Sequence, residues 1–154
     1  MRENNNCFAC GQDNSCGLHM DFYTDESAVY SFVSVPDHLC GWNNLAHGGI
    51  ISTLLDEIMS WAAIYLLKRI ILTKSITVDF IKPIYIQQSL KIIGQVEKHV
   101  HEKKAIMRGE IFNESEIRCA KSIGTFSLFT PERIKEHKIM DDNAMASLIE
   151  FMTL

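Results

Sequence analysis

Hydrophobic residues along this chain form one long run and five shorter segments in which β-branched and aromatic residues mix or alternate with polar ones. The long run covers residues 48–67, and Asp56 and Glu57 are the acidic residues that interrupt it. Its length and composition predict a helix that packs on several faces, with Lys68 and Arg69 placed to stabilise its negative C-terminal end. Strand character is predicted for residues 28–35, 72–84, 89–100, 104–112 and 117–129.

One long helix followed by an antiparallel meander predicts the α+β class, with the helix lying across the sheet. At 154 residues the chain is long enough for one domain with a substantial core. We therefore expect a single domain over residues 1–154 that begins with a Cys-rich opening segment at 1–26. Residues 131–154 predict a C-terminal helical extension, made of a helical turn and a short amphipathic helix from about Asp142.

Asp56 lies in the middle of the predicted helix and belongs to a narrow polar stripe. With successive residues placed about 100° apart, five small or hydroxyl-bearing neighbours fall within about 60° of it: Ser52, Gly49, Thr53, Ser60 and Ala63. A solvated stripe normally carries long charged side chains, whereas this one leaves room for a close approach. We therefore interpret Asp56 as a functional, partly desolvated carboxylate with a raised pKa rather than as a solvated surface group.

His47, Gly48 and Gly49 open the predicted helix and supply a second candidate group. The first amides of a helix have no partner within it and carry positive partial charge, and glycine leaves them accessible to a carbonyl oxygen. Eight residues separate Gly48 from Asp56, which is about 12 Å along the axis and too far for both to act on one carbonyl within one chain. The spacing favours a two-fold dimer, in which antiparallel helices bring Gly48 of one subunit near Asp56 of the other.

Four stretches of the sequence resemble a known family. GWNNLAHGGIISTLLDEIMSWAA resembles the helix motif of hotdog-fold acyl-CoA thioesterases, in the branch that contains the phenylacetate-pathway and hydroxybenzoyl-CoA enzymes. CFACGQDNSCGLHMDFY resembles the opening segment of many relatives, and SITVDFIKPI and CAKSIGTFSLF resemble the corresponding strands, so the likeness covers roughly residues 7–130. It implies a hotdog fold, in which a five- or six-stranded antiparallel sheet wraps a central helix, and a homodimer that often pairs into a homotetramer.

The resemblance also implies roles for individual residues. The Gly48 amide would polarise the thioester carbonyl, and Asp56 would act as a nucleophile or as a general base on water. Ser60, one helical turn after Asp56, matches a hydroxyl position that can hold this water, and Ser75 lies near a second such position. His47 belongs to the motif, and we assign it to shaping the helix entrance.

One position departs from the family pattern. Several members carry Asn or Gln seven residues before the oxyanion glycine, at the position of Gly41 here. Asn43 or Asn44 would have to substitute from a shifted loop, and we take Asn44 and Gly49 as candidate substrate-binding residues beside Ser75. The rate or the substrate range is expected to differ accordingly.

These observations predict an enzyme that hydrolyses acyl-CoA to a free acid and coenzyme A without a cofactor, at sites shared between subunits. A hydratase or dehydratase on the same fold is one alternative, but its usual motifs, Gly-Asp-x-Asn-Pro-x-His and His-Phe-Pro, are absent from the sequence. A non-catalytic acyl-CoA or lipid-binding protein is the other, and Asp56 beside small residues speaks against it. The acyl group, aliphatic or aryl, and the choice between coenzyme A and acyl-carrier-protein thioesters stay open.

Charge and cysteine content indicate which binding partners and which cellular compartment to expect. The net charge of −4 and a pI near 5.8 give no positive field for a nucleic acid. The N-terminus has no apolar signal segment and two acids interrupt the long hydrophobic run, so we expect a cytoplasmic protein with no membrane partner. Five cysteines, an odd number, suit free thiols in a reducing compartment.

Cys7, Cys10, Cys16 and His19 form a C-x2-C-x5-C-x2-H pattern that could in principle bind zinc. The gap between the two pairs is shorter than in usual zinc modules. We therefore predict buried or loop thiols and no metal at this segment, which metal analysis of untagged protein tests.

Overall fold

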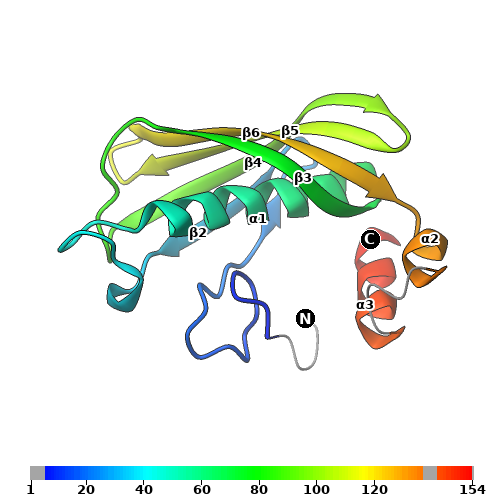
Figure 1. Cartoon of the computed structure of the whole chain (residues 1–154), viewed down its shortest axis with the longest axis horizontal. Coiled ribbons are helices and arrows are strands. Elements are labelled where there is room, and N and C mark those ends of the chain that lie inside the picture. The colour runs from blue at the N-terminus through cyan, green and yellow to red at the C-terminus, as the bar shows by residue number, and fades with distance from the viewer. Residues whose placement is uncertain (1–5, 137–141, 154) are drawn as a thin grey trace.

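An antiparallel sheet of six strands curves around one long helix (Figure 1). The structure is a computed structural model that describes residues 6–136 and 142–153. In chain order the elements are β1 (Tyr23–Thr24), β2 (Val29–Ser34), η1 (Asp37–Leu39), α1 (Gly48–Leu67), β3 (Ile70–Phe80), β4 (Ser89–His101), β5 (Lys104–Asn113), β6 (Arg118–Phe129), α2 (Pro131–Glu136) and α3 (Asp142–Thr153). The sheet order is β1-β2-β4-β5-β6-β3, so β1 and β3 form its two edges.

The hydrophobic pattern predicts most of these elements closely. α1 has the predicted bounds, and β2, β4, β5 and β6 match the predicted segments to within one residue at each end. The short β1 was not predicted, and β3 ends at Phe80, four residues earlier than expected. The N–H groups of Ile81 and Lys82 both bond to the carbonyl oxygen of Cys119, at 2.8 and 3.0 Å, and Pro83 has no N–H for a ladder bond.

Two glycines on neighbouring strands let α1 lie close to the sheet. Gly94 on β4 and Gly109 on β5 are register partners beneath the helix. A Cβ atom at Gly94 would lie 2.5 Å from the carbonyl oxygen of Ile58, closer than real Cβ contacts allow. The helix residues buried by this packing are Ile51, Leu54, Leu55, Ile58, Met59, Ser60, Ala62, Ala63 and Ile64. By length and composition α1 could also cross a membrane, but here its apolar side chains form the core.

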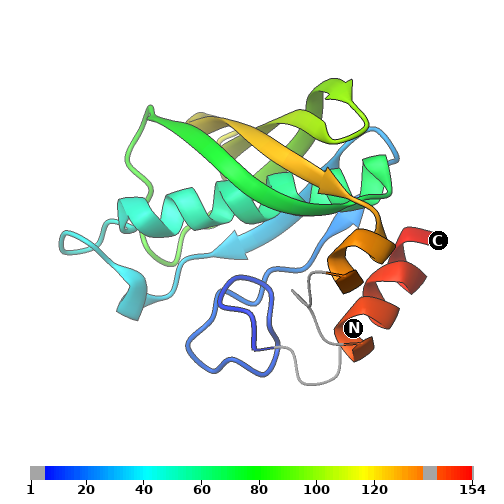
Figure 2. The same cartoon turned by 45° about the vertical axis from the view of Figure 1, so that its right-hand side comes forward.

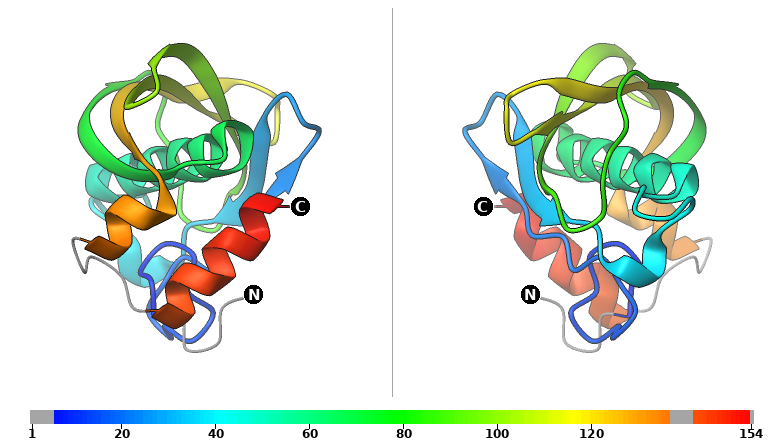
Figure 3. Two further views of the ribbon diagram at one scale, coloured as in Figure 1. Left: turned by 90° about the vertical axis from the view of Figure 1, so that its right-hand side faces the viewer. Right: turned by 90° about the vertical axis from the view of Figure 1, so that its left-hand side faces the viewer.

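The two sheet edges lie on opposite flanks of α1. Figure 3 shows β3 on one flank and β1 with β2 on the other. The opening segment, residues 6–22, lies on the side of α1 that faces away from the sheet, as Figures 1 and 2 show. Its side chains Ala9, Leu18 and Met20 are buried in the same core as α1. The helix therefore has one face covered by the sheet and two flanks with different neighbours.

In the described part of the predicted C-terminal extension, α2 and α3 pack near the end of α1 (Figure 2), and residues 137–141 and 154 lie outside the described residues. It forms a second, smaller apolar cluster with residues of α1 and β3. The buried members of this cluster are Ile64, Ile70, Ile134, Met145, Leu148 and Met152. This packing covers the C-terminal end of the helix and leaves its N-terminal end and both flanks to other segments.

Candidate active site

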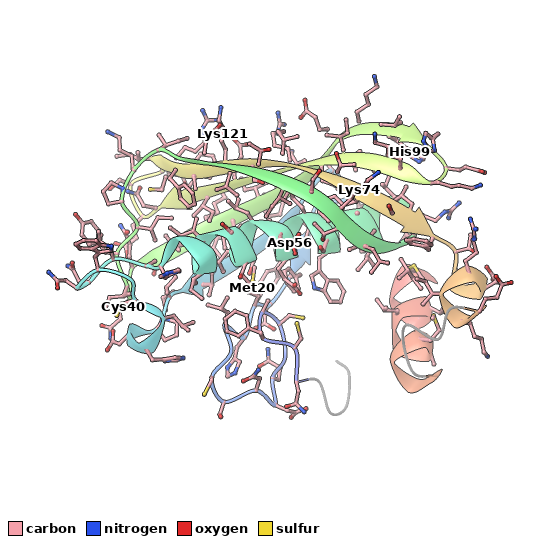
Figure 4. All side chains as sticks on the ribbon, viewed as in Figure 1. Met20, Cys40, Asp56, Lys74, His99 and Lys121 are labelled. Atoms are coloured by element: carbon pink, nitrogen blue, oxygen red, sulfur yellow. The ribbon has the colours of Figure 1, made fainter. Side chains whose placement is uncertain are left out.

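Asp56 lies in the middle of α1 on the flank that faces β3 (Figure 4). Its side chain is half-buried, and the Thr73 hydroxyl on β3 donates a hydrogen bond to its Oδ1 atom at 2.9 Å. Burial raises the pKa of Asp56 above its usual value, and the Thr73 hydrogen bond opposes that rise. Within the described residues no hydrogen bond reaches its Oδ2 atom. One carboxylate oxygen is thus oriented by the protein, and the other has no protein partner among these residues.

The other side chains of the polar stripe do not compete for this carboxylate. The hydroxyls of Ser52 and Thr53 donate to the backbone carbonyl oxygens four residues earlier, at 2.9 and 3.0 Å. Ser60 lies one turn after Asp56 on the same face of the helix and is buried. Asp56 and Ser60 therefore lie on neighbouring turns of one helix face, and the role of the Ser60 hydroxyl in holding a water stays a prediction.

The entrance of α1 is shaped by His47, which is the residue that caps the helix. Its backbone is extended, with φ −64° and ψ 138°, and its Nδ1 atom accepts a hydrogen bond from the Gly49 N–H at 2.9 Å. The Gly49 amide, a predicted binding group, is thus engaged within the cap. In the described part of the chain no hydrogen bond uses the Gly48 N–H, and Phe80 lies beside this glycine, 3.7 Å from where its Cβ would be. Gly48 is therefore the better candidate for an amide that meets a ligand.

Asn44 lies in an exposed loop just before this entrance. Its backbone carbonyl oxygen accepts a hydrogen bond from Ile86 at 2.9 Å, and Ala46 N–H donates to Ile84 at 2.9 Å. Asn43 in the same loop has a left-handed backbone, with φ 44°. The loop is therefore fastened to the segment after β3, and a substrate-binding role for Asn44 stays a prediction.

The hydroxyl that reaches Asp56 from β3 belongs to Thr73 and not to Ser75, the residue singled out in the sequence. A bulge lies between Thr73 and Ser75, and Lys74 has no register partner there (Figure 4). An extra residue in a strand inverts the alternation of its faces. After the bulge Ile76 is half-buried and Ser75 is exposed, whereas before it Thr73 contacts the helix. Strand alternation alone gives no signal for such a bulge.

The candidate site residues therefore fall into two groups on one chain. The predicted Asp56 and Ser60 lie one turn apart near the middle of α1, and Thr73 on β3, in place of the predicted Ser75, bonds to Asp56. Gly48 and Asn44 lie at its N-terminal entrance, eight or more residues away. Because α1 is a continuous helix, the separation from Gly48 to Asp56 is about 12 Å along its axis, as the sequence predicts.

Comparison with known proteins now decides the family. The sequence model described as the thioesterase superfamily matches residues 43–120, half of the chain, which include all of α1, β3, β4 and β5. The chain belongs to the thioesterase superfamily. An uncharacterized protein of Schizosaccharomyces pombe is 29% identical over 93 residues, which are 57% of this chain and 53% of that protein. The chain thus spans about half the length of this curated relative.

Solved structures share the fold of this thioesterase-superfamily chain. The Escherichia coli PaaI protein from the phenylacetic acid degradation operon has a TM-score of 0.66 at 21% identity, covering 73% of this chain and 81% of that one. A hypothetical thioesterase with coenzyme A from Streptococcus pneumoniae has 0.65 at 21%, covering 71% and 84%. A Streptococcus mutans protein bound to acetyl CoA has 0.65 at 23%, covering 71% and 87%. The predicted hotdog fold and the predicted family are confirmed.

Glu57, the next residue of this thioesterase-superfamily helix, faces the opening segment. The indole N–H of Trp61 donates to its Oε1 atom at 2.9 Å, and the thiols of Cys7 and Cys10 lie beside the same carboxylate. Burial raises the pKa of Glu57 above its usual value. Sequence reasoning did not connect Glu57 with the two cysteines, because spacing along the chain does not reveal a contact between segments some 50 residues apart.

The four residues of the C-x2-C-x5-C-x2-H pattern are not brought together as a whole. Cys16 is exposed, and the Nε2 atom of His19 is hydrogen-bonded to the Asn14 carbonyl oxygen at 2.6 Å. Across residues 6–136 and 142–153, the group of side chains close enough to share a metal ion is Cys7, Cys10 and Glu57.

Proposed function

We propose that this protein hydrolyses an acyl-CoA thioester to a free acid and coenzyme A, with Asp56 as the nucleophile or general base. The observation that carries the proposal is the half-buried Asp56 carboxylate, oriented by Thr73 and bordered by small residues, in a chain of the thioesterase superfamily. Two structural neighbours hold coenzyme A or acetyl CoA, which supports acyl-CoA as the substrate class. The family supports thioester hydrolysis as the general chemistry.

These groups allow two routes for hydrolysis of the thioester. In the first, Asp56 takes a proton from a water held near Ser60, and the water oxygen attacks the thioester carbon. The oxyanion that forms accepts a hydrogen bond from the Gly48 amide, and the carbon–sulfur bond then breaks, so that the coenzyme A thiolate leaves and takes up a proton. In the second, an Asp56 oxygen attacks the carbon and expels coenzyme A, and water then cleaves the mixed anhydride.

We propose further that Gly48 acts on the substrate of the partner subunit, in a homodimer. Gly48 and Asp56 of one chain lie about 12 Å apart along α1, too far to act on one carbonyl. A two-fold axis between antiparallel helices would instead bring Gly48 of one subunit beside Asp56 of the other. The edge strand β3 also supports it, because its outer side pairs with no strand in the described residues. Large apolar side chains on and near this edge are exposed in the single chain: Leu72, Phe80, Ile81 and Ile123.

A hydrolysis screen tests the activity. Release of thiol would be followed with short, medium, long and aryl acyl-CoAs and with an acyl-carrier-protein thioester, and Asp56→Asn would be the control. We expect turnover of at least one substrate that depends on Asp56. Binding of acyl-CoA without turnover would favour the non-catalytic binding protein, and water addition to an enoyl thioester would favour the hydratase.

Mixing two inactive variants tests the shared site. If Gly48 serves the partner's site, a mixed dimer of Asp56→Asn with Gly48→Pro contains one intact site and one doubly impaired site. After subunit exchange, random pairing restores about a quarter of the wild-type rate, since about half of the dimers are mixed. If both groups acted within one chain, no mixture would recover activity. Sedimentation of the same samples distinguishes a dimer from a tetramer.

A further inference from the structure

A second cluster of reactive side chains lies beside α1, on the flank away from β3. Cys7 and Cys10 come from the opening segment and Glu57 from α1, and all three are half-buried. Two sulfur atoms and one carboxylate oxygen of these residues lie within 4.8 Å of one another. In contrast to the expectation from the sequence of no metal at this segment, we propose that Cys7, Cys10 and Glu57 form a zinc site that fastens the opening segment to α1. This proposal does not depend on the proposed thioesterase activity.

The opening segment presents its two thiols from an ordered turn. The Cys7 carbonyl oxygen accepts a hydrogen bond from Gly11 N–H at 2.9 Å, and Met20 N–H donates to the Ala9 carbonyl oxygen at 3.0 Å. The side chains of Ala9 and Met20 are buried in the core, so the turn is held from both sides. A C-x2-C spacing in such a turn is the spacing with which zinc sites often supply a pair of thiolates.

The third group, Glu57, is held in place by an aromatic pair. The Trp61 indole N–H donates to Glu57 Oε1 at 2.9 Å, and the Trp61 ring stacks on Phe22 with centroids 5.0 Å apart. Hydrogen bonds to a ligating carboxylate are a usual second layer around a metal, because they fix the orientation of the ligand. Trp61 therefore orients the carboxylate, and its stacking joins the same two segments that the ion would join.

Electrostatics also support a cation at this position. The sulfur atoms of Cys7 and Cys10 lie within 4.8 Å of the same Glu57 carboxylate oxygen. In the part of the chain that the structure describes, no Lys, Arg or His forms an ion pair with Glu57. A divalent ion in this small space would stabilise the carboxylate and the two thiolates together.

The ligand set favours zinc over calcium or magnesium. Two thiolates and one carboxylate suit zinc, whereas the lighter ions take oxygen ligands. With zinc–sulfur bonds of about 2.3 Å, tetrahedral ligand atoms lie about 3.5–3.8 Å apart, so shifts of about 1 Å or less would close the site. A solvent molecule would complete the tetrahedron. Cys16 and His19 are not part of this set, in contrast to the pattern in the sequence.

Metal binding by the full, untagged chain tests the proposal directly. We expect purified protein to contain about one zinc per chain by mass spectrometry. Reduced protein stripped with a chelator should take up one Zn²⁺ in competition with a coloured chelator. Substitution with Co²⁺ should give the charge-transfer absorption of thiolate ligands. Failure of the stripped, reduced wild-type chain to bind either ion would overturn the proposal.

Variants with matched controls locate the site. Cys10→Ser and Glu57→Gln should each weaken zinc binding by about 100-fold or more, and Trp61→Phe by about 10- to 100-fold. Cys16→Ser and Cys40→Ser are the controls, because both cysteines are exposed and lie outside the cluster. Equal losses in the controls and in Cys10→Ser, or unchanged binding in Cys10→Ser, would contradict the assignment.

Proteolysis tests the fastening role separately from affinity. Zinc should slow cleavage within the opening segment of the wild-type chain and should leave cleavage of Glu57→Gln unchanged. This measurement requires no activity and uses the intact chain. Protection by zinc that persists in Glu57→Gln would show that the ion does not link the opening segment to α1.

Discussion

Asp56 and Glu57 are neighbours in the sequence, yet they lie on different flanks of α1. Successive side chains on a helix point about 100° apart, and here one meets Thr73 on an edge strand while the other meets Trp61 and Cys10. Burial raises the pKa of both carboxyl groups. Both acids are thus partly buried carboxyl groups with a raised pKa, and the difference between them comes from the partners that each flank supplies.

The partners suit the two acids to different tasks. On the β3 flank, small residues leave space, and a single hydroxyl orients one oxygen of Asp56. On the other flank, a stacked indole and two thiols surround Glu57. A carboxylate with an available oxygen can take a proton or attack a carbonyl, whereas one surrounded by thiols is suited to share a metal. Substituting one acid at a time therefore tests whether the two carboxyl groups have separate functions.

The largest expected effect is on Asp56. Asp56→Asn should lower kcat for thioester hydrolysis by at least about 100-fold and by as much as about 10,000-fold, because a carboxamide can serve neither as base nor as nucleophile. Glu57→Gln is the matched control on the same helix and should lower zinc binding while leaving kcat nearly unchanged. Thiol-release kinetics and zinc titration of both variants measure this. Equal loss of kcat in the two variants would show that the flanks do not have separate tasks.

The second largest effect concerns the Gly48 N–H, which is proposed to bind the substrate carbonyl in the partner subunit's site. Gly48→Pro removes this N–H and should lower kcat by about 100- to 1000-fold, the usual effect of losing one oxyanion donor. Proline is tolerated at the first position of a helix, and His47 already has the extended backbone that must precede proline.

Gly48→Ala is the control for this substitution, because it adds a side-chain carbon and keeps the N–H. Its Cβ would meet Phe80 at an ordinary distance of 3.7 Å. We expect Gly48→Ala to retain most of the activity, with circular dichroism confirming the helix in both variants. Similar rates for the alanine and proline variants would remove the Gly48 amide from the mechanism.

The sequence predicted the features that follow from periodicity and motif. The bounds of α1, the strands β2, β4, β5 and β6, the polar stripe around Asp56 and the family are all legible along the chain. These features depend on neighbours close in sequence, which a repeat of 3.6 or 2 residues reveals.

Contacts between distant segments were missed, each for a physical reason. The extra residue Lys74 inverts the faces of β3, so Thr73 and not Ser75 reaches the helix. Glu57 meets Cys7 and Cys10 because the opening segment folds back across α1, a path that no local pattern encodes. The sequence therefore placed Asp56 on a polar stripe of the helix and gave no partner for Glu57.

The third prediction concerns the packing of α1 against the sheet, on which the positions of both Asp56 and Glu57 depend. Gly94→Ala should lower the free energy of unfolding by about 1–3 kcal/mol, because its Cβ would lie 2.5 Å from the Ile58 carbonyl oxygen and the helix would have to shift. Chemical denaturation measures this, and both kcat and zinc affinity should fall together. Ala62→Gly in addition should not restore stability, because the nearer obstacle is backbone. Full rescue would identify the Ala62 side chain, 3.1 Å away, as the real constraint.

The smallest effect separates orientation of Asp56 from its presence. Thr73→Val removes the hydroxyl that bonds to Asp56 Oδ1 and nearly keeps the volume of the side chain. The residue is exposed, so water replaces part of the lost bond, and we expect kcat to fall only about fivefold to tenfold, or about 1 kcal/mol of barrier. Thr73→Ser keeps the hydroxyl and should stay close to the wild-type rate. If the valine and serine variants had equal rates, the hydrogen bond at 2.9 Å would have no part in positioning the carboxylate, and burial by the small residues of α1 alone would hold it.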